Sequence, residues 1–323
     1  MQQFFPHRYQ YFSPLLPKLV FSFSLIFFAA NSASASVIKE AEIYKTRNQV
    51  ELNLGQNPEW LEAQPGDVIA PRDAVRTGAN SRADILFNEG TLVRTGAGTT
   101  FRFPPGKRSF ELTSGAALIM IRPDQGQSTI NTPEAKIVSQ GTALFVQHNP
   151  ESRSSLIGVL TESPAGLVEI SSTDGKISLK LQAGQFVSIV QGVVGLVENF
   201  VLPMFYETAE LAEGLGMEPE AMEAFLSQES DEVQTTVRAV QAEAVEPLQN
   251  QLAWLKGFCK LRIRAENITP LMQILGAGVS DAKLNLEVPK ADLSIIPFRS
   301  PEGLTWLGKY CQGNQTLPPV ESP

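Results

Sequence analysis

Few residues in this sequence could support catalysis. Histidine occurs twice, at His7 and His148. His7 lies in an N-terminal segment that we expect to be removed, and His148 stands before Asn149 and Pro150, where a solvated turn residue is expected at the end of a strand. A Ser–His–acid arrangement would therefore depend on His148 alone. We assign no catalytic residue.

Residues that bind metals or cofactors also lack the required spacing. With one histidine and two distant cysteines, no zinc-ligand pattern is present. Carboxylates cluster at Glu229, Asp231 and Glu232, but at an expected helix start, where they complement the helix dipole. The three G-x-G stretches lack the third glycine and the βαβ setting of a dinucleotide site. The sequence therefore predicts no metal and no cofactor.

The two cysteines, Cys259 and Cys311, lie in the part of the chain expected to be exported. An oxidising compartment would let them pair, so we expect one disulfide. Spacing does not establish geometry, and two separate buried thiols are the alternative.

Charge is unevenly distributed along the chain. Residues 72–122 hold eight Arg or Lys against four acids, whereas residues 207–246 hold eleven acids and one Arg. Two interpretations are open: the segments face each other or water, or the basic one binds an acidic ligand or partner. The residues to test for such a ligand or partner face are Arg76, Arg82, Arg94 and Arg102.

The N-terminus reads as a secretory signal peptide over residues 1–35. Arg8 and Lys18 precede an apolar run over residues 19–30, and Ala33-Ser34-Ala35 forms a small-x-small site with cleavage before Ser36. The apolar run is shorter than the roughly 20 residues that span a bilayer, so an uncleaved anchor is the weaker alternative. Removal leaves 24 basic against 34 acidic residues, a net of −10. We expect no nucleic-acid binding and no membrane span after cleavage.

Three further regions follow the signal peptide. Residues 36–200 read as short strands with alternating apolar residues and glycine-containing turns, which predicts a mainly β, many-stranded solenoid or sandwich. Residues 201–258 read as an acidic helical region, whose best helix covers residues 232–256 with Pro247 as a kink and Gly257 as its end. Residues 259–323 read as a small mixed C-terminal region with a loose tail.

The order of motifs over about residues 64–190 resembles the FecR domain, a periplasmic module of cell-surface signalling proteins. The positions that carry the resemblance are Gly66, Asp67, Gly78, Gly90, Gly115, Thr132, Pro133, Gly141, Thr142 and Gly184. Each glycine follows a strand end, where a positive φ is cheap for glycine alone, and the threonine hydroxyls are placed to bind free backbone groups. Signalling members carry a cytoplasmic anti-sigma segment before one membrane span. In this sequence we expect a signal peptide in that place, so direct control of a sigma factor is not expected.

The resemblance implies an exported FecR-like binding, sensor or scaffold protein of the bacterial envelope, periplasmic or at the cell surface. We expect a non-enzymatic protein that recognises an envelope protein partner. Two alternatives are a carboxylate-dependent enzyme acting on polysaccharide, which needs no histidine, and a purely structural envelope protein.

Overall fold

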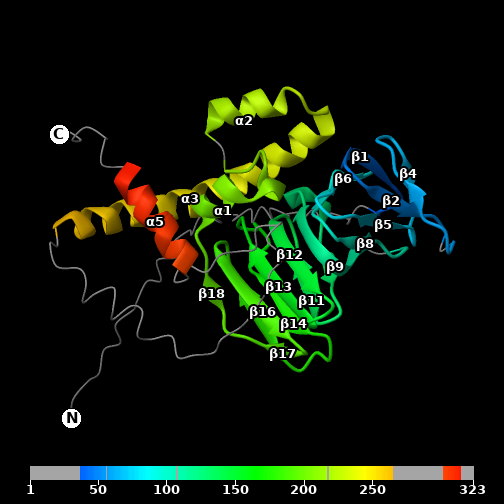
Figure 1. Cartoon of the computed structure of the whole chain (residues 1–323), viewed down its shortest axis with the longest axis horizontal. Helices are drawn as coiled ribbons and strands as arrows, with labels where there is room; N and C mark the ends of the chain where they lie inside the picture. Colours follow the sequence, from blue (N-terminus) through cyan, green and yellow to red (C-terminus); the bar gives the residue numbers. More distant parts are fainter. Residues whose placement is uncertain (1–36, 56, 107, 217, 265–300, 314–323) are drawn as a thin grey trace, which may run out of the picture. The chain divides into compact units, whose positions relative to one another are not determined.

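The computed structural model describes residues 37–264 and 301–313, apart from positions 56, 107 and 217 (Figure 1). The predicted signal peptide, residues 1–35, lies outside the described residues. So do residues 265–300 and 314–323 of the predicted C-terminal region. The boundaries proposed between the three later regions stay predictions.

The described strands form one hydrogen-bonded network of 18 members, which divides into two sheets. Sheet A runs in spatial order through β4 (Val68–Ile69), β1 (Ala41–Arg47), β6 (Arg82–Phe87), β7 (Leu92–Thr95), one end of β9 (Ser109–Met120), β12 (Ala143–Asn149), β13 (Ser154–Val159) and β16 (Gln185–Val190), with β17 (Val193–Val194) and β18 (Glu198–Asn199) at its edge. Sheet B runs through β3 (Leu61–Glu62), β2 (Val50–Asn53), β5 (Ala74–Thr77), β8 (Thr100–Arg102), the other end of β9, β10 (Ser128–Asn131), β11 (Ala135–Ser139), β14 (Val168–Ser172) and β15 (Ser178–Leu181). The chain is therefore mainly β, as predicted.

Strand β9 joins the two sheets. Its first half pairs with β8 and β10, the latter in parallel, and its second half pairs with β7 and β12. Gly115 lies between the halves with φ +79°, and a Cβ there would be 2.4 Å from the Cα of Thr99. A side chain would meet both a strained backbone and a fixed neighbour, so the crossing of β9 between sheets requires glycine.

Most of the motif glycines adopt a backbone conformation that favours glycine. Positive φ values occur at five of the six motif glycines, namely Gly66, Gly90, Gly115, Gly141 and Gly184. Gly78 is different: its φ is not positive, and a Cβ would lie 2.9 Å from Oε1 of Gln49, at the end of a flexible side chain. The hydroxyl of Thr132 accepts from the amide of Ala135 at 3.0 Å, which closes the turn at Pro133.

The main core lies between the two sheets. Alternating side chains of both sheets meet there, including Ile85 and Phe87 from sheet A and Phe101, Phe110 and Ile137 from sheet B. Phe87 packs edge-on against Phe110 with ring centroids 5.1 Å apart. Phe101 is buried and Arg102 is exposed, as the alternation predicts for a strand with one face in the core.

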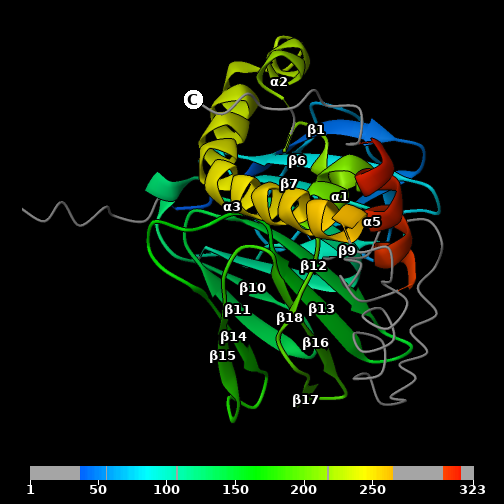
Figure 2. The ribbon, with the colours of Figure 1, turned by 90° about the vertical axis from the view of Figure 1, so that its left-hand side faces the viewer.

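The other face of sheet A is covered by helices (Figure 2). The helical elements are η1 (Pro123–Gln125), α1 (Leu202–Thr208), η2 (Glu210–Ala212), α2 (Pro219–Leu226), α3 (Asp231–Arg264) and α5 (Pro301–Gly313). Val233, Val237 and Val240 of α3 pack in one cluster with Leu118 and Phe145 of sheet A. Both faces of sheet A are therefore buried, which explains the nearly continuous apolar run in the second half of β9.

Helix α3 is longer than predicted. It continues through Gly257 to Arg264, and Gly257 has no positive φ, so the prediction that it ends the helix was wrong. Pro247 lies inside the helix, and the ribbon of α3 in Figure 2 changes direction along its length. Proline has no amide N–H, so one hydrogen bond of the helix is missing and the helix can bend. Helix α3 extends this far because its second half is packed: Leu255 and Cys259 are buried against α1 and α5.

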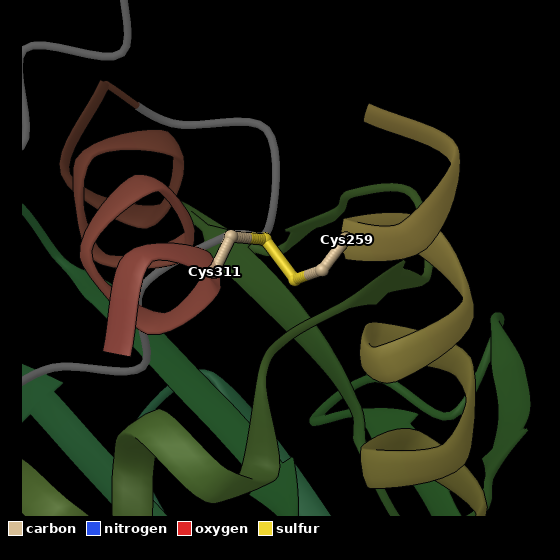
Figure 3. Close-up of a disulfide and its surroundings, with 2 residues drawn as sticks. All are labelled: Cys259 and Cys311. Atoms are coloured by element: carbon tan, nitrogen blue, oxygen red, sulfur yellow. A yellow bond between two sulfur atoms is a disulfide. The ribbon is translucent and has the colours of Figure 1, made fainter. Parts of the chain in front are cut away.

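A disulfide joins Cys259 of α3 to Cys311 of α5 (Figure 3), as predicted. Both cysteines belong to a small cluster with Val201, Met204 and Leu307, so α5 is fixed by a covalent bond and by apolar packing. None of the helices in the described residues combines the length and the apolar character needed to cross a bilayer.

Candidate functional site

A cleft of about 860 Å³ opens between sheet A and the helical segment. Strands β1, β6 and β7 form one side, and α1, η2, α2 and the loop before α3 form the other. Its lining combines basic side chains from the strands with acidic ones from the helical segment, together with Tyr206, Leu215 and Phe225. The cleft is therefore the place where the basic and acidic segments of the sequence meet.

On the strand side of the cleft, two arginines share one carboxylate. Arg82 binds Asp84 through Nε at 2.9 Å and Nη2 at 3.1 Å, and Arg94 Nε lies 3.5 Å from the same carboxylate. Arg94 is only 1% exposed. Its Nη1 donates to the carbonyl oxygens of Leu211 and Glu213, while its Nε has no hydrogen-bond partner.

The pKa values of the two guanidinium groups shift in opposite directions. Burial lowers the pKa of Arg94 and outweighs the opposing attraction of Asp84. Burial acts in the same direction on Arg82, but its hydrogen bonds to Asp84 and its attraction to Glu213 prevail, so the pKa of Arg82 is raised. Arginine stays protonated in proteins, so Asp84 compensates the buried charge of Arg94 and shares the charge of the half-buried Arg82 with Glu213.

Ion pairs connect the strands to the helical segment across the cleft. Lys45 lies 2.6 Å from Glu229, Arg82 lies 3.3 Å from Glu213, and Arg47 pairs with Glu210. Glu229 is nearly buried and also accepts from the Tyr44 hydroxyl at 2.9 Å. The eleven acids of residues 207–246 thus face the basic strands in part, which is the first of the two interpretations left open by the sequence.

The four arginines proposed as one face are divided between the two sheets. Arg82 and Arg94 line the cleft, whereas Arg76 and Arg102 lie on the outer face of sheet B. Arg76 pairs with Glu51 at 2.5 Å and stacks on the ring of Trp60 at 4.2 Å; its hydrogen bond lowers the pKa of Glu51. The structure therefore offers two surfaces in place of one, and a role for either stays a prediction.

His148 is not the solvated turn residue predicted. It lies within β12, it is 3% exposed, and its Nδ1 is 3.0 Å from the hydroxyl of Ser155 on β13. That hydroxyl is 2.7 Å from the hydroxyl of Thr132, so the imidazole ends a buried polar chain between the sheets. Desolvation lowers the pKa of His148, and the charge of Glu134 opposes it. The prediction was wrong because β12 continues to Asn149, one residue beyond His148.

Sequence reasoning missed Lys45, Arg47 and Glu229, which line the cleft, and Tyr44, whose hydroxyl donates to Glu229. The uneven distribution of charge was the available signal, but it did not identify partners separated by more than 180 residues. Within the described ranges, no group of three or more His, Cys, Asp or Glu side chains is placed to hold a metal ion.

One comparison with known proteins matches most of the two-sheet region. A family model described as FecR protein matches residues 73–194, from the residue before β5 to the end of β17. No curated protein sequence matches the chain. Two crystal structures of a candidate anti-sigma factor from Parabacteroides distasonis ATCC 8503 are similar at 19% identity and a TM-score of 0.34. The similarity covers 39% of this chain and 59% of that one, less than two thirds of its length. This chain therefore carries a FecR domain over residues 73–194 of its two-sheet region.

Proposed function

We propose that this chain is an exported protein of the bacterial envelope that acts by recognising a protein partner and catalyses no reaction. The FecR domain supports this assignment, and the candidate site is the cleft between sheet A and the helical segment. The observation that carries the proposal is that the ionisable groups of the cleft are bound to one another. Asp84 and Glu229 are held by Arg82 and Lys45, and their side chains are only 6% and 5% exposed.

A general acid or base must reach the proton that it transfers, so such committed carboxylates are poorly suited to catalysis. His148 is equally unsuited, since it is enclosed between the sheets. Recognition of a protein partner requires instead that side chains can exchange their contacts. Exposed ion pairs are weak, typically about 0–1 kcal/mol, and can be exchanged for pairs with a partner at little cost.

The rim of the cleft offers such exchangeable pairs. Arg47 and Glu210 keep 49% and 41% of their side chains exposed, and Glu213 keeps 56%. A partner that presents both charges could replace these contacts while the half-buried Phe225 supplies apolar surface. This arrangement fits a protein surface, in which a polar rim surrounds an apolar centre.

Photo-crosslinking in the native envelope tests the proposal. A photoreactive residue at Gln228, which is exposed in the cleft, should capture one defined envelope protein that mass spectrometry identifies. The matched control is Ser178, which is exposed on β15 of sheet B and should not capture that protein. Adding the R47E substitution to the Gln228 probe should reduce the capture.

Two outcomes would contradict the proposal. Equal labelling of many proteins from Gln228 and Ser178 would favour a purely structural envelope protein. Turnover of cell-wall or capsular glycans by the purified mature protein would favour the carboxylate-dependent enzyme.

A further inference from the structure

Sheet A ends at an edge that exposes apolar side chains. After β16 the chain turns and returns along that strand as β17 and β18, which Figure 1 shows beside it. In this return, Val193, Leu196 and Val197 are 70%, 85% and 41% exposed. Within the described ranges no further strand pairs with residues 193–199, so this edge of sheet A is open there.

Part of the backbone of this edge is directed away from β16. The amide of Gly195 donates to the carbonyl of Ser188 on β16 at 2.8 Å. Backbone groups of successive residues in a strand point to opposite sides, so those of Val194 and Leu196 point away from β16. Such a row of N–H and C=O groups can bind another strand, and proteins often protect an edge with charged residues or proline. Residues 191–197 contain neither.

The charges at the two ends of this edge favour antiparallel pairing with a second copy of the chain. Glu198 is exposed and forms no ion pair with another described residue. The other end adjoins Arg153, whose carbonyl accepts from the amide of Gln191 at 2.8 Å. Arg153 pairs with Glu134 at 3.4 Å but keeps 66% of its side chain exposed, and a guanidinium has five N–H donors. An antiparallel copy brings each Glu198 to the Arg153 end of the other molecule, whereas a parallel copy would place like charges together.

We propose that two copies of this chain pair antiparallel along this edge, so that sheet A continues across a dimer. In the register centred on Gly195, Leu196 of each copy lies opposite Val194 of the other, and Glu198 lies opposite Gly192. The contact has twofold symmetry, so each copy covers the edge of the other. The paired stretch is short, because the register against β16 shifts by one residue between Val194 and Glu198. This surface shares no residue with the lining of the recognition cleft, so the dimer is a property beyond the proposed recognition of a partner.

The mass of the intact mature protein in solution, measured by light scattering after gel filtration, should equal that of two chains. Leu196→Lys should weaken the dimer by at least about tenfold, because it places two ammonium groups among apolar side chains. The matched control is Val68→Lys on β4, at the opposite edge of sheet A, where the side chain is 61% exposed. That control should leave the dimer unchanged. Both positions are exposed, so both variants should keep the far-UV circular dichroism of the parent.

Crosslinking between introduced cysteines tests the direction of pairing, and Cys259 and Cys311 do not interfere because they form a disulfide. Leu196→Cys should give a crosslinked dimer with a short thiol crosslinker, since diagonal neighbours across an antiparallel pair are about 7–8 Å apart. Asn199→Cys should not, because the two copies of that position would lie about eight residues, or about 27 Å, apart along the strands. A monomeric parent, a dimer that Leu196→Lys leaves intact, or equal crosslinking from the two cysteine variants would overturn the proposal.

Discussion

The carboxylate of Asp84 is the single residue on which the cleft depends most. Asp84→Asn removes the counter-charge of a buried guanidinium, and breaking a buried pair in this way costs about 3–5 kcal/mol. Arg94→Met should cost less than half as much, because Asp84 keeps its two hydrogen bonds to Arg82. Urea unfolding of the mature protein measures both free energies, with Glu220→Gln as a control that leaves the midpoint unchanged. Equal losses for the two variants would contradict the shared-carboxylate arrangement.

His148 makes the stability of the two-sheet region sensitive to acid. Its pKa is lowered in the folded protein by desolvation, so the unfolded chain binds the proton more readily. Stability contributed by the neutral imidazole is full above about pH 6.5 and falls as pH drops below that value. His148→Gln should flatten the fall between pH 7.5 and 5. Denaturant titrations at both pH values compare the variant with the parent, and parallel curves would show that His148 does not control the pH dependence.

At the scale of elements, β9 depends on glycine where it passes between the sheets. Gly115→Ala combines φ +79° with a Cβ placed 2.4 Å from the Cα of Thr99, so we expect a loss of at least about 3 kcal/mol. Gly98→Ala is the matched control: its φ is +63°, but no atom lies within 4 Å of the added Cβ. That control should cost only about 1–2 kcal/mol, the penalty for the left-handed conformation. Thermal unfolding would contradict the account if the two losses were the same.

The disulfide fixes one helix and not the sheets. Its two cysteines are 52 residues apart, and a loop of that length corresponds to about 4 kcal/mol in the chain-entropy model. Because both cysteines lie in the small cluster with Leu307, reduction should expose α5 to protease while the two sheets stay intact. Limited proteolysis of reduced and oxidised protein measures this difference. Simultaneous cleavage of the sheet region on reduction would contradict it.

At the scale of the whole molecule, the sequence predicted the class of structure but not its layers. Alternation around Phe101 and Arg102 correctly predicts a strand with one buried face, since that pattern is local. The division into two sheets depends on which distant strands pair with each half of β9, and local patterns carry no information on that choice. The glycine at position 115 marked a bend without indicating that two sheets meet there.

The sequence also did not predict that the arginines of the cleft are covered by other residues. Arginine is rarely buried, so Arg82 and Arg94 are expected at the surface by residue type alone. Their cover comes from residues near Leu211 and Glu213, more than 110 positions later in the sequence. His148 was misplaced for the opposite reason, because the following Asn149 and Pro150 form a turn signal that says nothing about the neighbouring strand. Residue types indicated which side chains could take part in a site. Contacts with residues distant in the sequence then determined whether each side chain is buried and what it binds.

Hydrogen exchange of the intact mature protein tests the central claim most directly, because the recognition cleft exists only if the acidic helices dock on sheet A. The apolar cluster that joins Val237 and Val240 to Phe145 predicts that amides of α3 in this segment share the protection of β12 and open with the same free energy. Fast exchange of this segment beside a protected sheet would show that the helices are not docked, and the cleft and its proposed function would then be wrong.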